Sequence, residues 1–131
     1  MSSPCFCCDA MLGGLARWLR FAGFDTTVPV LASDRALEQA ARAEGRWLLT
    51  RDRELAARAG PRVLCIQSLA VPEQVAEVSR RLRLRVDPAG FFSRCSRCNG
   101  RLVPLGREEA QGLVPPYVAT HASEFSRCEG C

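Results

Sequence analysis

The sequence predicts an α/β fold, in which a parallel sheet carries helices on both faces, followed by a small four-cysteine zinc module. Two observations lead to this prediction. Three successive segments each run from an apolar strand through an aspartate and an amphipathic helix to a glycine, which is the order of a parallel sheet with helical crossovers. Two Cys-x-x-Cys pairs follow near the end of the chain, and paired knuckles of this kind are typical of zinc modules.

Four strands alternate with four helices in the predicted sheet. The near-continuous apolar character of the strands indicates a sheet covered on both faces, and the first three helices each stop at a glycine, a common helix terminator. Pro29 favours the edge of the sheet for the second strand. The strands are expected at 6–8, 26–31, 46–50 and 62–66, and the helices at 12–22, 34–44, 53–59 and 72–84.

Composition indicates one ordinary globular domain with a small appendage. The chain has 131 residues, of which 47% are hydrophobic, and its 18 basic residues, all arginine, face 14 acidic ones, which excludes a disordered or fibrous protein. No stretch approaches the roughly 18 apolar residues of a membrane helix, and no secretion signal precedes the first strand. We therefore expect a soluble protein of the cytoplasm, with a sheet domain at 1–90 and a cysteine module at 91–131.

The two knuckles of the cysteine module supply four thiols, from Cys95, Cys98, Cys128 and Cys131. This set predicts a tetrahedral structural zinc site, which leaves no open position for substrate chemistry. A segment of about 40 residues rarely buries enough apolar surface to fold alone, so a metal would also explain its folding. The alternatives are a disulfide pair or a chance arrangement. The other four cysteines lie in or beside predicted strands and are expected to be buried thiols.

An aspartate follows each of the first three predicted strands, at Asp9, Asp34 and Asp52. The carboxyl ends of parallel strands form one edge of the sheet, where ligands bind. Carboxylates that gather there repel unless a cation neutralises them, and Mg²⁺ or Mn²⁺ suits oxygen ligands. Such an ion supports hydrolysis of a phosphodiester. The alternative is that each aspartate is only a helix N-cap, a position that favours this residue.

The stretch from Asp9 to Asp25, Asp-Ala-Met-Leu-Gly-Gly-Leu-Ala-Arg-Trp-Leu-Arg-Phe-Ala-Gly-Phe-Asp, together with Leu49-Thr50-Arg51-Asp52 and the two later cysteine pairs, resembles the Mut-seven C-terminal RNase domain family. The resemblance extends from about Phe6 to Cys131. It implies a PIN-like nuclease fold with a zinc ribbon, and a metal-dependent ribonuclease. Its acidic residues would correspond to Asp9, Asp34 and Asp52, with Thr50 helping to shape the metal loop.

Arginines supply candidate contacts to RNA. Seven arginines and one aspartate lie between Arg80 and Arg101, and arginine grips phosphate with paired donors. The candidate RNA-binding residues are Arg17, Arg51, Arg53 and Arg81. The alternative for the arginine-rich stretch is an ordinary solvated surface.

The aromatic residues indicate a function less specifically than the arginines do. Phe91 and Phe92 fit either a hydrophobic seam between the two modules or a surface on which bases stack, and Trp18 and Trp47 are expected in or near the core.

These observations favour a ribonuclease with a catalytic Mg²⁺ or Mn²⁺ and a structural Zn²⁺. A second hypothesis is a non-catalytic RNA-binding module, associated with the ribosome or with tRNA, in which the aspartates are only caps. A third is a protein-interaction adaptor that uses the surface of the cysteine module.

Overall fold

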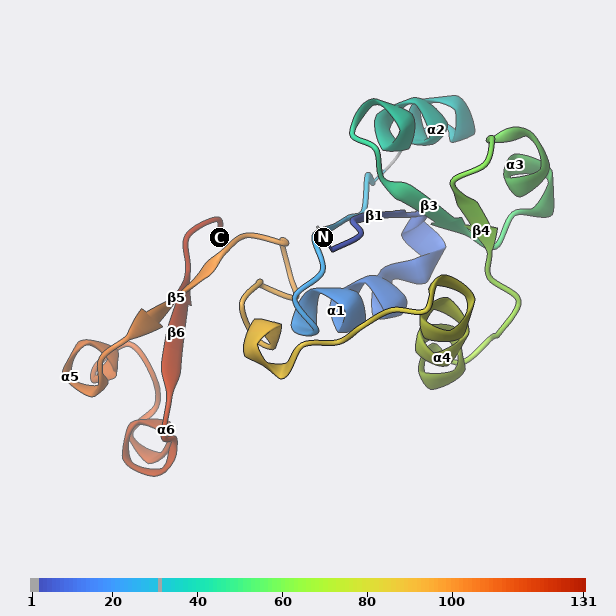
Figure 1. Cartoon of the computed structure of the whole chain (residues 1–131). Helices are drawn as coiled ribbons and strands as arrows, with labels where there is room; N and C mark the ends of the chain where they lie inside the picture. Colours follow the sequence, from blue (N-terminus) through green and yellow to red (C-terminus); the bar gives the residue numbers. More distant parts are fainter. Residues whose placement is uncertain (1–2, 31) are drawn as a thin grey trace.

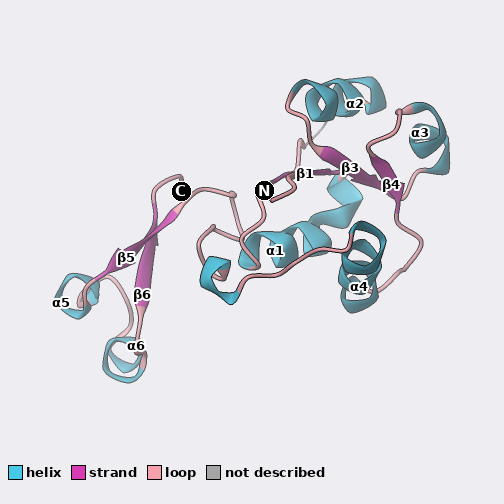
Figure 2. Ribbon diagram, viewed as in Figure 1, coloured by secondary structure: helices cyan, strands magenta, loops and turns pink. Residues whose placement is uncertain are grey.

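The computed structural model describes residues 3–30 and 32–131 and confirms the α/β fold. Four parallel strands form one sheet in the order β2-β1-β3-β4. Figures 1 and 2 label β1, β3 and β4 of this sheet. The second strand lies at the edge, as Pro29 predicted, and is shorter than expected; Leu31, the end of the predicted strand, lies outside the described residues. The strands are β1 (Phe6–Cys8), β2 (Thr26–Thr27), β3 (Trp47–Thr50) and β4 (Val63–Cys65).

Helices cover both faces of this sheet, and the strand residues alternate between two buried clusters. Phe6 and Cys8 pack on the side of α1 (Gly13–Phe21) and α4 (Val71–Leu82). Cys7 points to the opposite side, where it packs with residues of α2 (Asp34–Ala43) and α3 (Arg53–Arg58). The alternation follows from the period of two in a strand. It also buries Cys7 and Cys8 on opposite faces, as predicted, whereas Cys5 and Cys65 are only half-buried.

The cysteine module is a β-hairpin with two short helices. Strands β5 (Leu102–Leu105) and β6 (Phe125–Cys128) pair antiparallel, and α5 (Arg107–Ala110) and α6 (Pro116–His121) lie at the end of the hairpin farther from the sheet (Figure 1). A 3-10 turn, η2 (Pro88–Gly90), connects α4 to this module. Among the described residues, no helix is long and apolar enough to cross a membrane.

The connecting segment lies directly on the end of α1. The backbone N–H of Phe92 donates to the carbonyl oxygen of Phe21 at 2.9 Å, and the two rings meet edge to face at 5.6 Å. Gly23 has a φ of +96°, and a Cβ there would lie 2.5 Å from the carbonyl oxygen of Gly90. Glycine is therefore required at this crossing, both for its backbone conformation and for the close approach.

Candidate functional site

Asp9 and Asp52 lie at the carboxyl ends of the neighbouring strands β1 and β3, and Thr50 joins them. The Thr50 hydroxyl donates to Asp9 Oδ2 at 3.0 Å and accepts the backbone N–H of Asp52 at 3.0 Å. The Asp9 N–H donates to the carbonyl oxygen of Leu49 at 3.0 Å, so the register of the two strands also fixes this edge. Thr50 is fully buried, whereas Asp9 and Asp52 are half-buried. Both carboxylates thus lie at the sheet edge where ligands bind in such folds.

Both aspartates also cap helices, as the simpler interpretation predicted. Asp9 Oδ1 accepts the N–H of Met11 at 2.8 Å, at the start of η1 (Ala10–Leu12). Asp52 Oδ1 accepts the N–H groups of Glu54 and Leu55 at 2.9 and 3.3 Å, at the start of α3. A carboxylate oxygen has lone pairs for more than one partner. Capping therefore orients the two side chains without using up their capacity to bind a cation.

Asp34 takes a different position. It is the first residue of α2, whose N-cap is Ser33, and its carboxylate makes an exposed ion pair with Arg58 at 3.4 Å. Within the described ranges, the aspartates do not form a group of three ligands whose oxygens all lie within 4.8 Å of one another. Two of the three predicted acids are thus linked through Thr50, and the third pairs with an arginine.

The four candidate RNA-binding arginines fall into two classes. Arg51 donates to the carbonyl oxygens of Ser68 and Ile66 at 2.6 and 3.4 Å, and Arg81 donates to Cys65 and Glu77 at 2.8 and 3.0 Å. Arg51 therefore holds the segment after β4, and Arg81 connects the end of β4 to α4. Arg17 and Arg53 are exposed on α1 and α3, where a bound phosphate could reach them.

The four predicted zinc ligands come together at the base of the β5–β6 hairpin. Their sulfurs all lie within 4.8 Å of one another, and the separations Cys95–Cys131, Cys98–Cys128 and Cys128–Cys131 are 3.8, 3.4 and 3.7 Å. Four thiolates at about 2.3 Å from a tetrahedral zinc would be about 3.8 Å apart. The cluster is therefore compatible with zinc.

The backbone around this cluster favours thiolates. Hydrogen bonds from the N–H groups of Cys131 and Gly130, both at 3.3 Å, lower the pKa of Cys128 to about 6. Side-chain hydrogen bonds with the other cysteines, Cys98 first, raise the pKa of Cys131 to about 12, because thiolates this close repel without a cation. Gly130 leaves room for the sulfurs, since a Cβ there would lie 3.1 Å from Cys98 Sγ.

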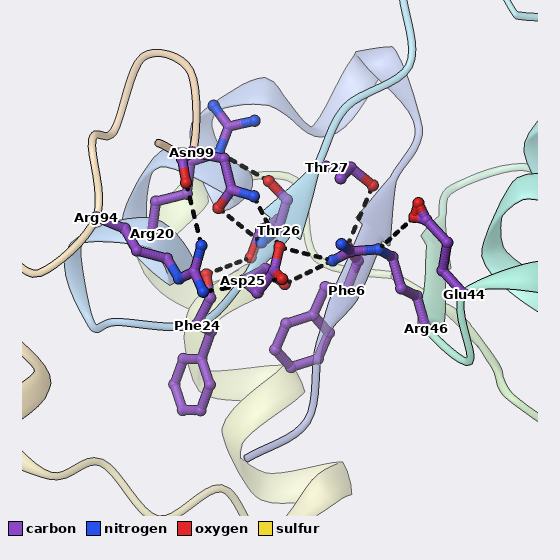
Figure 3. A network of polar contacts seen from close by, with 10 residues as sticks. All are labelled: Phe6, Arg20, Phe24, Asp25, Thr26, Thr27, Glu44, Arg46, Arg94 and Asn99. Carbon is purple, nitrogen blue, oxygen red and sulfur yellow. Dashed lines mark hydrogen bonds and ion pairs between the residues drawn. The ribbon is translucent and has the colours of Figure 1, made fainter. Parts of the chain in front are cut away.

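The first knuckle docks on the open edge of β2 through Asn99 (Figure 3). Its side-chain oxygen accepts the N–H of Thr26 at 2.9 Å, and its amide nitrogen donates to Asp25 at 2.7 Å. Asn99 has a φ of +72°, a left-handed conformation that asparagine tolerates. Arg20 reaches from α1 to the carbonyl oxygen of Ser96 at 3.0 Å. Sequence analysis missed these residues, although an asparagine directly after a cysteine knuckle is a signal for such a turn.

Arg46 extends this polar network into the sheet (Figure 3). It donates to Asp25 at 2.8 Å and to Glu44 at 3.0 Å, and it also contacts the carbonyl oxygen of Phe6 at 3.2 Å. Burial alone would raise the pKa of Asp25, but hydrogen bonds from Arg46 and Asn99 hold it below its ordinary value. The network therefore connects the cysteine module to β1, β2 and the start of β3.

Comparison with known proteins agrees with this architecture. The sequence model of the Mut7-C RNAse domain matches residues 4–131. The chain belongs to the Mut7-C RNase domain family. The Mut7-C match includes the Asp9–Thr50–Asp52 edge and all four clustered cysteines.

A curated relative of this Mut7-C chain is the protein of Homo sapiens named exonuclease mut-7 homolog. It is 40% identical over 98 residues, which are 70% of this chain and 11% of that protein. The chain thus spans about a tenth of the length of this relative. No solved structure gives a significant match.

Proposed function

We propose that this Mut7-C chain is a metal-dependent ribonuclease that hydrolyses RNA phosphodiester bonds at the carboxyl edge of β1 and β3. The observation that supports this most directly is the buried Thr50 hydroxyl, which donates to Asp9 and accepts from the backbone of Asp52. A hydroxyl that binds the side chain of Asp9 and the backbone of Asp52 links two acidic residues at the ligand-binding edge of a parallel sheet, and two separate helix caps do not require such a link.

The donor set at this edge suits Mg²⁺ or Mn²⁺. Both ions prefer hard oxygen ligands, and Mg²⁺ commonly binds through one or two carboxylates while it keeps several waters. Asp9 and Asp52 would hold the ion, and Asp34 would be the third acid. The Asp34–Arg58 ion pair is 3.4 Å long and exposed on both sides, so separating it costs little. A bound ion would acidify water and stabilise charge on the phosphate.

The remaining predicted residues take supporting roles in this proposal. Thr50 positions Asp9, and the exposed Arg17 and Arg53 would contact RNA phosphates. Arg51 and Arg81 act as positioning residues, because their guanidinium groups already bind the carbonyl oxygens of Ser68, after β4, and of Cys65, at the end of β4. Zinc at the four cysteines would be structural, since four thiolates complete its shell. The site of action would be cytoplasmic RNA.

Cleavage of end-labelled single-stranded RNA with Mn²⁺ tests the proposal. Asp9→Asn and Asp52→Asn should lower the cleavage rate at least a hundredfold while the fold persists, because asparagine is also a good N-cap. Glu108→Gln is the matched control: it removes an exposed carboxylate of α5 in the cysteine module and should cleave like the wild type. Equal cleavage by all four proteins, or none by the wild type, would contradict the proposal.

A further inference from the structure

An apolar groove of about 400 Å³ lies between α1, α4 and the segment that leads into the cysteine module. We call it the aromatic groove, because Trp18 and Phe21 line it from α1, and Phe91 and Phe92 line it from the connecting segment. No charged side chain of the described residues lines it.

The aromatic rings of this groove are more exposed than core residues would be. Trp18 is 57% exposed and Phe92 is 63% exposed, so the expectation that Trp18 belongs to the core is wrong. Trp18 and Phe21 lie 6.1 Å apart between ring centroids, and Phe21 and Phe92 lie 5.6 Å apart. The three rings therefore follow one another along the groove and leave aromatic surface open to a flat ligand.

The backbone of Phe92 adopts an energetically unfavourable conformation. Its φ is +60°, a left-handed conformation that is a genuine outlier for a bulky side chain. The hydrogen bond from its N–H to the carbonyl oxygen of Phe21 fixes this conformation. A strained residue that presents an exposed ring points to a binding role.

Positive charge borders the groove on both walls. Arg17 precedes Phe21 by four residues on α1, and Arg83, the C-cap of α4, directly precedes the lining residue Leu84. Residues four apart share a helix face, so Arg17 stands on the wall that α1 forms, and Arg83 adjoins the opposite wall through its neighbour Leu84. Both are exposed, and no ion pair is recorded for either within the described parts of the chain. Aromatic rings flanked by cations suit a single-stranded nucleic acid, because its bases stack on the rings and its phosphates form ion pairs with the arginines.

The groove also lies within reach of the candidate active site. Helix α1 starts directly after the turn that Asp9 caps, and a helix rises about 1.5 Å per residue. Trp18 and Phe21 are five and eight residues beyond the first residue of α1. A short single strand of RNA can therefore span from the edge at Asp9 to these rings.

We propose that the aromatic groove binds bases of single-stranded RNA that extends from the cleavage site along α1, with Trp18 and Phe92 as stacking platforms and with Arg17 and Arg83 as phosphate contacts. This inference rests on the proposed RNA substrate. It adds a subsite that depends on stacking and therefore accepts any base, because every base has a π-face.

Fluorescence anisotropy with a fluorescein-labelled 12-nucleotide oligo(U) tests the proposal, with the full zinc-loaded chain and no added Mg²⁺ or Mn²⁺. Trp18→Ala and Phe92→Ala should each weaken binding about tenfold or more, with an unchanged salt dependence, because the lost partner is an uncharged base. Arg83→Gln should instead reduce the salt slope by about one. Tyr117→Ala is the matched control, since it removes a 72% exposed aromatic side chain from α6 and should bind RNA like the wild type.

The outcomes separate this inference from the proposed catalysis. If Trp18→Ala and Phe92→Ala keep their melting temperatures and bind RNA like the wild type, the subsite is wrong even where cleavage occurs. If no variant cleaves RNA but binding still depends on Phe92, the subsite stands and the catalytic proposal falls. A wild-type dimer in sedimentation that Phe92→Ala dissociates, with RNA binding unchanged, would assign the groove to a second copy and overturn the inference.

Discussion

The buried hydroxyl of Thr50 fixes the position of a candidate catalytic carboxylate. Its oxygen serves both Asp9 and the backbone of Asp52, and its neighbour Leu49 binds the N–H of Asp9. The position of the Asp9 carboxylate therefore depends on a side chain that is 41 residues away in the sequence.

Thr50→Val tests this role, because valine has the same shape but no hydroxyl. We expect about 1 kcal/mol lower stability, since the Asp52 N–H loses its acceptor, and at least tenfold slower RNA cleavage, since Asp9 is no longer fixed. Thr50→Ser keeps the hydroxyl and should retain most of the activity. Urea denaturation and the RNA cleavage assay measure the two effects. A valine variant as active as the serine variant would show that the bridge does not position Asp9.

The carboxylate of Glu77, on helix α4, fixes the segment that connects β4 to α4. This carboxylate is 5% exposed and accepts hydrogen bonds from Gln67, Ser68 and Arg81 at 2.9 to 3.1 Å. Burial alone would raise the pKa of Glu77, but these donors outweigh it and lower the pKa below the ordinary 4.5. The same segment binds Arg51, so Glu77 indirectly fixes the arginine beside Asp52.

Glu77→Gln should destabilise the protein by about 2 kcal/mol at pH 7, because an amide NH₂ would then face N–H donors. The folded-state pKa of Glu77 is lowered, so its contribution is fully present above pH 4.5 and is lost as the pH falls through the folded-state value. Urea unfolding of both proteins at several pH values checks this. The difference in unfolding free energy should shrink below pH 4.5, and a difference that stays constant down to pH 3 would contradict it.

The helices and strands themselves were largely predictable. Alternation along β1, the glycines after the first three helices and the aspartate caps are local signals, and the resulting elements agree with the prediction to within a few residues. The second strand is the exception, because β2 pairs on one side with β1 and its outer edge is taken by Asn99. A contact made by a side chain 73 residues away leaves no trace in local periodicity.

At the scale of the whole molecule, the cysteine module covers an open sheet edge. Unpaired strand edges are liable to non-native pairing, and Asn99 and Arg20 attach the first knuckle to β2 and α1. Asn99 directly follows Cys98, and Ser96, the partner of Arg20, lies between Cys95 and Cys98. Folding of this knuckle around a metal should therefore stabilise the sheet domain as well as the module.

A chelator added to chain that has been loaded with zinc should consequently loosen β2 in addition to residues 95–131. Hydrogen exchange followed by mass spectrometry should show faster exchange at the Thr26 amide after chelation, with a lower melting temperature for the whole chain.

Asn99→Gly is the matched variant: it keeps the left-handed backbone but removes both hydrogen bonds, so Thr26 should exchange fast with or without zinc. If the Thr26 amide of the wild type exchanges as slowly after chelation as before it, the cysteine module does not stabilise β2 through the metal.

The sequence by itself determined the alternation of strands and helices, the two cysteine knuckles and the aspartates at strand ends, because these depend on neighbours within one turn or one knuckle. The tertiary structure alone decided which of these groups meet. It joined Asp9 to Asp52 through Thr50, paired Asp34 with Arg58, turned Arg51 toward the backbone and left Trp18 exposed. Each of these outcomes depends on contacts between segments far apart in the chain, and such contacts form only when the elements pack.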